Sequence, residues 1–351
     1  MQDLQITEEL EKNIEDKGDI SNIKHYSFEN IYHYKSFFRF FRTLKMINNQ
    51  SDYLIKLKDI KLYNNDNQTQ VDLIFSDEGI DLDSFINSKI YDYRKQKHLI
   101  KWILFQLLKG IETLHSLNII HRDINPKNII ISSTGKITLS GFEYSIIDIE
   151  SKEVKDKIIG NLPYIGPECL LSLNYDHKID IWSVGIIMIE LYLKSTNLLT
   201  LKKENNIEDS NINDDYNSLF LSQLKNISNF FSVNFIVNFK NINDSLSWLN
   251  NAKFNKDTFD RIFGNNTILD HGALDLLKKL IAFNPKDRIS AKDALKSNYF
   301  QELLYIYYKD YNLSKFMINL EKEFQKKESE DVKVSRFKKE LINLCQNECQ
   351  K

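Results

Sequence analysis

One segment constrains the fold of this 351-residue chain more than any other, because it is apolar on nearly every side. It is the run Ile181–Leu193, which Asp180 precedes and Glu190 interrupts. A bilayer span needs about 20 consecutive apolar residues, so the run is too short to cross a membrane and we expect no span. A helix that is apolar all round lies inside a large domain. We therefore predict a buried helix over Asp180–Tyr192, surrounded by other elements.

The composition fits one two-lobed domain or two small domains. Hydrophobic residues make up 42% of the chain, which is enough for a large core. Lys plus Arg number 47 against 49 Asp plus Glu, so no nucleic-acid or acidic-membrane partner is expected. The three cysteines, Cys169, Cys345 and Cys349, form neither a disulfide framework nor a zinc pattern. We predict a cytoplasmic protein in a reducing environment, because the acidic N-terminus also lacks an apolar signal segment.

Hydrophobic periodicity places strands early in the chain and helices later. A broad aromatic stripe at helical spacing predicts a helix over 29–48. Strands are predicted at 53–63 and 70–76, and further helices at 82–90, 98–117, 219–231, 245–263 and 272–282. This order predicts an α+β protein. We divide it into a reduced N-terminal lobe (1–76), a helical lobe (77–302) with an Asn/Asp-rich low-complexity loop at 203–217, and a charged helical tail (303–351).

The stretch 119–143 contains the residues whose side chains are best suited to catalysis. An apolar pair leads into His121-Arg122-Asp123, and Asn128 follows five residues after the aspartate. Two short β-rich runs come next, split by a Ser-Thr-Gly turn, and then Gly141-Phe142-Glu143. Asp123 is a candidate general base.

This layout resembles that of protein kinases, in which His-Arg-Asp-x-x-x-x-Asn is followed by a hairpin and Asp-Phe-Gly. The similarity extends from about Tyr53 to Phe300, and residues 104–123 resemble cyclin-dependent and related kinases most closely. Gly166-Pro167-Glu168 stands for the family's Ala-Pro-Glu. The resemblance implies a bilobal fold with a β-rich N-lobe and a helical C-lobe.

The resemblance also implies structural roles in the large lobe. Glu168 and Arg288 would form a buried ion pair, and Asp180 would cap backbone amides of the catalytic loop. Arg122 would lie near the activation segment, and His121 would pack in the core. All of these residues are retained, so we expect an intact large-lobe scaffold.

The positions that the family uses for chemistry depart from its pattern. Gly141 stands at the metal-binding aspartate, eighteen residues after Asp123, and glycine has no ligand atom. Asn125 replaces a lysine that steadies the γ-phosphate, and Asn161 replaces a threonine that ties the activation segment to the catalytic aspartate. Asp123 and Asn128 survive. We predict no metal site; an active enzyme would need Glu143 or Asp148 as a relocated ligand.

The small lobe departs further. No G-x-G-x-x-G precedes Asp123, so no such loop is expected to cradle phosphates. We favour Lys24 as the strand lysine, interpreted as a solvated side chain, and keep Lys35 as the alternative. The partner glutamate then falls at Phe40. The segment Phe75-Ser76-Asp77-Glu78 would join the lobes and face an adenine.

These losses favour a pseudokinase, a kinase-like fold that acts as scaffold, allosteric partner or structural subunit. Its partners would be proteins, such as an active kinase or a large assembly, and no cofactor is expected. One alternative is a divergent serine/threonine kinase that transfers the ATP γ-phosphate to protein. Another is a module that binds ATP without Mg²⁺ and without catalysis.

Overall fold

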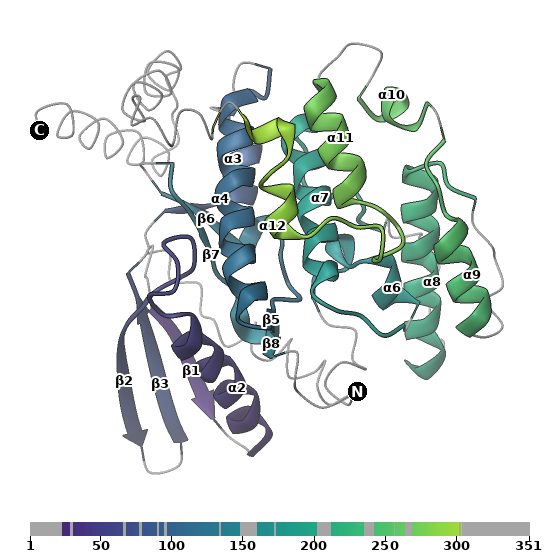
Figure 1. Cartoon of the computed structure of the whole chain (residues 1–351). Coiled ribbons are helices and arrows are strands. Elements are labelled where there is room, and N and C mark those ends of the chain that lie inside the picture. Colours follow the sequence, from purple (N-terminus) through teal and green to yellow (C-terminus); the bar gives the residue numbers. More distant parts are fainter. Residues whose placement is uncertain are drawn as a thin grey trace, which may run out of the picture.

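The computed structural model describes most of residues 23–303, and in this part a small sheet with one helix adjoins a larger helical region (Figure 1). The residues that it leaves undescribed are 1–22, 29–30, 66–67, 77–78, 90, 95–96, 133–134, 148–159, 172, 202–211, 235–241, 256, 264–268, 302 and 304–351. The predicted α+β bilobal fold is confirmed. The charged tail and the 1–22 segment lie outside the described residues, and the lobe boundary at 76/77 stays a prediction.

The small lobe contains a three-stranded antiparallel sheet. Strands β1 (Ile23–Phe28), β3 (Gln68–Phe75) and β2 (Leu57–Asn65) follow one another in the order β1-β3-β2. Helix α2 (Ile31–Ile47) follows β1 along the chain and precedes β2. It buries Phe40, Leu44 and Ile47, whereas Phe38, which the predicted aromatic stripe included, is 62% exposed.

Short strands form two further small sheets, one of which contacts the small lobe. Strands β4 (Ile80–Asp81), β6 (Ile129–Ile131) and β7 (Ile137–Leu139) form one sheet, and β5 (Ile119–Ile120) pairs with β8 (Ile146–Ile147). The predicted hairpin after Asn128 is thus β6–β7. The backbone of Leu139, in β7, bonds to the small-lobe segment that precedes β2. Its carbonyl accepts from the Ile55 N–H at 3.0 Å, and its N–H donates to Tyr53 O at 2.9 Å.

The large lobe is built around α7 (Lys178–Leu193), whose residues from Ile179 to Tyr192 are all buried. The other helices are α3 (Leu82–Asn87), α4 (Lys97–Ser116), α6 (Pro167–Leu170), α8 (Ile212–Phe230), α9 (Ile242–Asn251), α10 (Thr258–Phe263), α11 (His271–Leu280) and α12 (Ala291–Ala294). The buried helix predicted over Asp180–Tyr192 is therefore confirmed. None of the helices described is long and apolar enough to cross a membrane.

Two segments differ from the prediction by more than a few residues at one end. The segment 245–263 contains two helices, α9 and α10, because side chains between and beside them bind the backbone of a neighbouring turn: Asn255 Nδ2 donates to Ser232 O at 2.6 Å, and Thr258 Oγ1 to Phe231 O at 3.1 Å. These long-range bonds hold the chain between the two helices against the turn that follows α8. The predicted loop at 203–217 is wrong from Ile212 on, where α8 begins. The Asn/Asp content that indicated a loop also suits a first helical turn, since negative charge there complements the helix dipole.

A buried ion pair ties α6 to the chain that follows α11. Arg288 donates to both carboxylate oxygens of Glu168, at 2.6 and 3.0 Å. Its remaining donors bind the carbonyls of Lys178, Ala282 and Phe283 at 2.8 to 3.2 Å. Glu168 and Arg288 are each 1% exposed, so the pair lies in the interior with its polar atoms satisfied.

Replacing Arg288 with methionine should lower the free energy of unfolding by roughly 3–5 kcal/mol, because Glu168 would keep a buried charge without a partner. Urea unfolding at neutral pH measures this change. Lys279→Met is the matched control, since Lys279 pairs with Asp275 on the surface and should cost no more than about 0.5 kcal/mol. Equal costs for the two variants would contradict the assignment.

Candidate functional site

Asp180 holds the loop that carries Asp123. Its Oδ2 accepts from the His121 N–H at 3.0 Å and lies 2.9 Å from His115 Nε2, and its Oδ1 accepts from the Arg122 N–H at 3.0 Å. Burial opposes ionisation of Asp180, but the hydrogen bond and charge of His115, together with the bond from the His121 N–H, outweigh it and lower the pKa of Asp180. The carboxylate thus caps the backbone amides that the resemblance implied.

His121 fixes the same loop from inside the core. Its Nε2 lies 2.9 Å from Ser140 O, and its Nδ1 accepts from the Asp123 N–H at 3.3 Å. This pattern requires the neutral tautomer with hydrogen on Nε2, and burial lowers the pKa of His121 accordingly. The ring also packs against Phe142 at 4.6 Å between centroids. His121 therefore joins the loop to the end of β7.

Arg122 lies where the resemblance placed it, beside the segment after Phe142. Its Nε donates to Tyr144 O at 2.6 Å, and its Nη1 donates to Tyr175 Oη at 3.0 Å. Its φ of 68° is uncommon for a residue with a side chain. The bond from its N–H to Asp180 helps to hold that backbone conformation.

Both oxygens of the Asp123 carboxylate accept hydrogen bonds from the chain itself. Oδ1 accepts from Asn125 Nδ2 and from the Asn161 N–H, both at 3.0 Å, and Oδ2 accepts from Asn128 Nδ2 at 2.7 Å. Burial raises the pKa of Asp123 to about 6, against the lowering effect of these bonds. Asn161 acts through its backbone, so the loss of the threonine does not remove this tie. Asn125 is buried and adds a neutral donor where the family has a lysine.

The backbone at Gly141 passes close to the side chain of Asn128. Its φ is 81°, in the left-handed region, and a Cβ placed on it would lie 2.3 Å from Asn128 Cγ. The magnesium that the resemblance implies does not fit this donor set, because Gly141 offers no oxygen and Asn128 directs its nitrogen at Asp123. No three His, Cys, Asp or Glu side chains gather as a metal site anywhere in the described chain.

Lys24 on β1 is paired with Glu143, which lies in a short 3₁₀ turn at Phe142–Tyr144. Lys24 Nζ lies 2.6 Å from Glu143 Oε1, and Tyr26 Oη donates to the same oxygen at 3.1 Å. Burial opposes ionisation of Glu143, but the charge and hydrogen bond of Lys24 prevail and lower the pKa of Glu143. Lys24 is exposed, with 43% of its side chain accessible, but it takes part in an ion pair that the sequence did not predict. Lys35, the alternative, belongs to α2 rather than to a strand.

Phe40 stands among aromatic rings instead of facing the lysine as a carboxylate. The Tyr26 ring lies 5.6 Å from Phe40 and 5.3 Å from Phe37, and Phe37 stacks on Phe41 at 5.8 Å between centroids. Apolar and aromatic packing therefore joins α2 to β1. The acid that neutralises Lys24 comes from the large lobe, through Glu143.

The predicted adenine-facing segment is only partly described. Phe75 is 4% exposed and belongs to the core of the small lobe. The Ser76 N–H donates to Lys56 O at 3.1 Å, so this amide is already bonded within the lobe. Asp77 and Glu78 lie outside the described residues.

Sequence reasoning missed two features of the site. Tyr26 was not singled out, and Glu143 was considered only as a metal ligand. The available signal was the reversed order Gly-Phe-Glu, which moves the acid two residues along the loop. With phenylalanine at the helix position, the sequence offers Glu143 as another carboxylate for Lys24.

A family model described as protein kinase domain matches residues 11–300. The match covers well over half of the chain, which therefore belongs to the protein kinase family. It begins upstream of Tyr53, where the resemblance of individual residues starts, so the small lobe is included in the family domain.

Asp123 should titrate near pH 6, and Asn128→Ala should raise its pKa further by removing a bond to the ionised form. Carboxyl ¹³C NMR of aspartate-labelled protein measures both values. Since the native pKa exceeds the unfolded value of about 3.9, the folded state binds more protons between these pH values. The contribution of Asp123 to stability therefore falls as pH rises from about 4 to 6 and is constant above that. The control Asn255→Ala should leave the Asp123 pKa unchanged; a titration near pH 4 would contradict the assigned burial.

Gly141→Ala should destabilise the fold by about 1–3 kcal/mol, because alanine disfavours a positive φ and its Cβ would meet Asn128. In an Asn128→Ala background the same change should cost less, since only the backbone strain remains. Chemical denaturation of the four proteins in this double-mutant cycle measures the coupling. Identical costs in both backgrounds would show that Asn128 does not restrict position 141.

Proposed function

We propose that this protein kinase domain is a pseudokinase, which does not carry out efficient phosphoryl transfer and acts through protein contacts as scaffold, allosteric partner or structural subunit. The observation that carries the proposal is the Lys24–Glu143 pair. A lysine on this strand would contact ATP phosphates in an active member of the family. Here a carboxylate of the chain takes that place.

An incoming nucleotide would compete with Glu143 for Lys24. The phosphates would also meet the carboxylate of Glu143 as a like charge, without a metal aspartate at Gly141 to hold a neutralising cation. The pair is partly exposed, with 43% of the Lys24 and 31% of the Glu143 side chain accessible, so its own strength is modest. Glu143 would therefore disfavour phosphate binding by its charge and would not block the site sterically.

The catalytic loop supports the same proposal. Asn125 supplies no positive charge for a transferring phosphoryl group, whose negative charge the family stabilises with cations. Asn125 and Asn128 donate hydrogen bonds from their amide nitrogens to the Asp123 carboxylate. The polar side chains of the loop therefore bind one another. We infer that the loop has a structural role rather than a catalytic one.

A divergent active kinase is the second candidate, and one observation favours it. A pKa of about 6 leaves Asp123 ionised at neutral pH, which suits a general base. Such an enzyme would have to release Glu143 from Lys24 and bring it to the phosphates. Asp148, the other acid considered for this role, lies outside the described residues.

Nucleotide binding without metal or transfer is the third candidate. It would use Lys24 once Glu143 is displaced. The cyclin-dependent-like subgroup is part of our proposal and rests on residues 104–123, although Ile165 replaces the arginine usual before Ala-Pro-Glu in that group. An active kinase or a large assembly as partner and the cytoplasm as compartment are proposed on sequence grounds alone.

Thermal unfolding with ATP, with and without Mg²⁺ or Mn²⁺, separates these candidates. We expect no shift for the wild-type chain. Glu143→Gln should gain a metal-independent rise of roughly 2–4 °C at saturating ATP, because Lys24 becomes available to phosphate. Asp275→Asn is the matched control: it also removes an acid that pairs with a lysine, but on α11.

Two outcomes would overturn the proposal or redirect it. A metal-dependent rise in the wild-type chain, together with phosphate transfer that Asp123→Ala abolishes, would establish an active kinase. A metal-independent rise in the wild-type chain without transfer would establish the nucleotide-binding module. A Glu143→Gln variant that behaves like Asp275→Asn would show that Glu143 does not control access to Lys24.

A further inference from the structure

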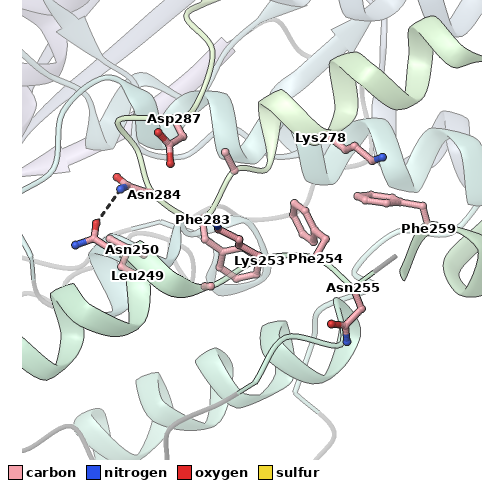
Figure 2. Close-up of a pocket in the computed structure, with 12 residues that line it drawn as sticks. Leu249, Asn250, Lys253, Phe254, Asn255, Phe259, Lys278, Phe283, Asn284 and Asp287 are labelled. Atoms are coloured by element: carbon pink, nitrogen blue, oxygen red, sulfur yellow. Dashed lines mark hydrogen bonds between the residues drawn. The ribbon is translucent and has the colours of Figure 1, made fainter. Parts of the chain in front are cut away.

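A cavity of about 440 Å³ lies in the large lobe, at the end remote from the three-stranded sheet (Figures 1 and 2). Residues from the end of α9, from α10, from α11 and from the chain after α11 line it. Its volume falls in the range of sites that bind a ligand or a side chain of a partner. The cavity shares no lining residue with the Lys24–Glu143 site or the catalytic loop.

Aromatic rings form the apolar wall of this cavity. Phe254, which is half-buried, lies 5.1 Å from Phe259 and 5.4 Å from Phe283 between ring centroids. Phe259 and Phe283 are buried and belong to the large-lobe core. The wall is therefore held by core packing, and a group that enters the cavity meets a preformed apolar surface.

Charged side chains surround the wall. Lys278 Nζ lies 5.2 Å above the Phe259 ring, and Lys253 is exposed. In the described chain neither lysine has a carboxylate partner within 4.0 Å, and the same holds for Asp287 with respect to basic groups. Figure 2 shows Lys278 beside Phe259 at one end of the cavity and Asp287 at the other.

A pair of amides completes the rim. Asn284 Nδ2 donates to Asn250 Oδ1 at 2.8 Å, which links the chain after α11 to α9 (Figure 2). This exposed bond joins the two sides of the cavity. The rim is thus polar while the wall is apolar, the arrangement found at protein recognition sites.

We propose that this cavity is a docking site for a segment of a partner protein in which a large apolar side chain stands next to a carboxylate. The apolar side chain would cover Phe254, and the carboxylate would face Lys278 and Lys253. Charge complementarity selects this occupant, because two lysines without acidic partners adjoin the aromatic wall. Asp287 fixes the direction of the segment by repelling acid at the opposite end. The site is independent of whether the domain transfers phosphate.

Selection from a phage-displayed random peptide library on the immobilised full-length chain tests the proposal. We expect enriched peptides to place an aromatic or large aliphatic residue beside an acidic one. The affinity of such a synthetic peptide, measured by fluorescence anisotropy, should fall roughly two- to fivefold in Lys278→Gln. Lys279→Gln, on the same helix but paired with Asp275, should bind like the wild-type chain.

A second variant keeps the test independent of charge. Ala252→Phe should fill the cavity from a half-exposed position and abolish peptide binding, while an unchanged unfolding temperature shows that the fold is retained. Failure to enrich any peptide would overturn the proposal. So would enriched peptides without an acidic residue, or equal affinity for Lys278→Gln, Ala252→Phe and the wild-type chain.

Discussion

The carboxylate of Asp180 is the interaction on which the arrangement of this domain depends. It stands at the start of α7, the helix that the large lobe surrounds, and binds the backbone amides of His121 and Arg122. Because α7 is buried on every side, it cannot shift without disturbing the whole core. The loop that carries Asp123 is therefore fixed to a helix that is buried on every side, whatever chemistry the loop performs.

This anchoring of the loop does not depend on which residues stand at the positions that the family uses for chemistry. The Glu168–Arg288 pair and the Asp180 cap each satisfy buried charge, so loss of either partner would be costly. Asn125 and Gly141 carry no such constraint from the core. Their substitutions are absorbed locally, by hydrogen bonds to Asp123 and by the close approach of Asn128.

The sequence was sufficient for features that depend on periodicity or on a well-defined motif. The helix over Asp180–Tyr192, the aromatic helix α2 and the β6–β7 hairpin follow from local patterns, and their bounds agree within a few residues. The partner of Lys24 could not be found in this way, because Glu143 is 119 residues distant and the pairing depends on how the lobes meet. The break between α9 and α10 was also missed, since it depends on bonds from Asn255 and Thr258 to a neighbouring turn.

The position of the acid that neutralises Lys24 has a mechanical consequence. On α2 the acid would make the lysine's ion pair depend on where that helix lies, which is how the family couples helix position to activity. Glu143 instead belongs to the turn after β7, so the pair joins β1 directly to the large lobe. Helix α2 instead packs on β1 through the rings of Phe37 and Phe40. The carboxylate at position 143 thus links the small lobe to the large one through a partly exposed ion pair. For this reason a single return of aspartate at position 141 would leave the lysine still bound to Glu143.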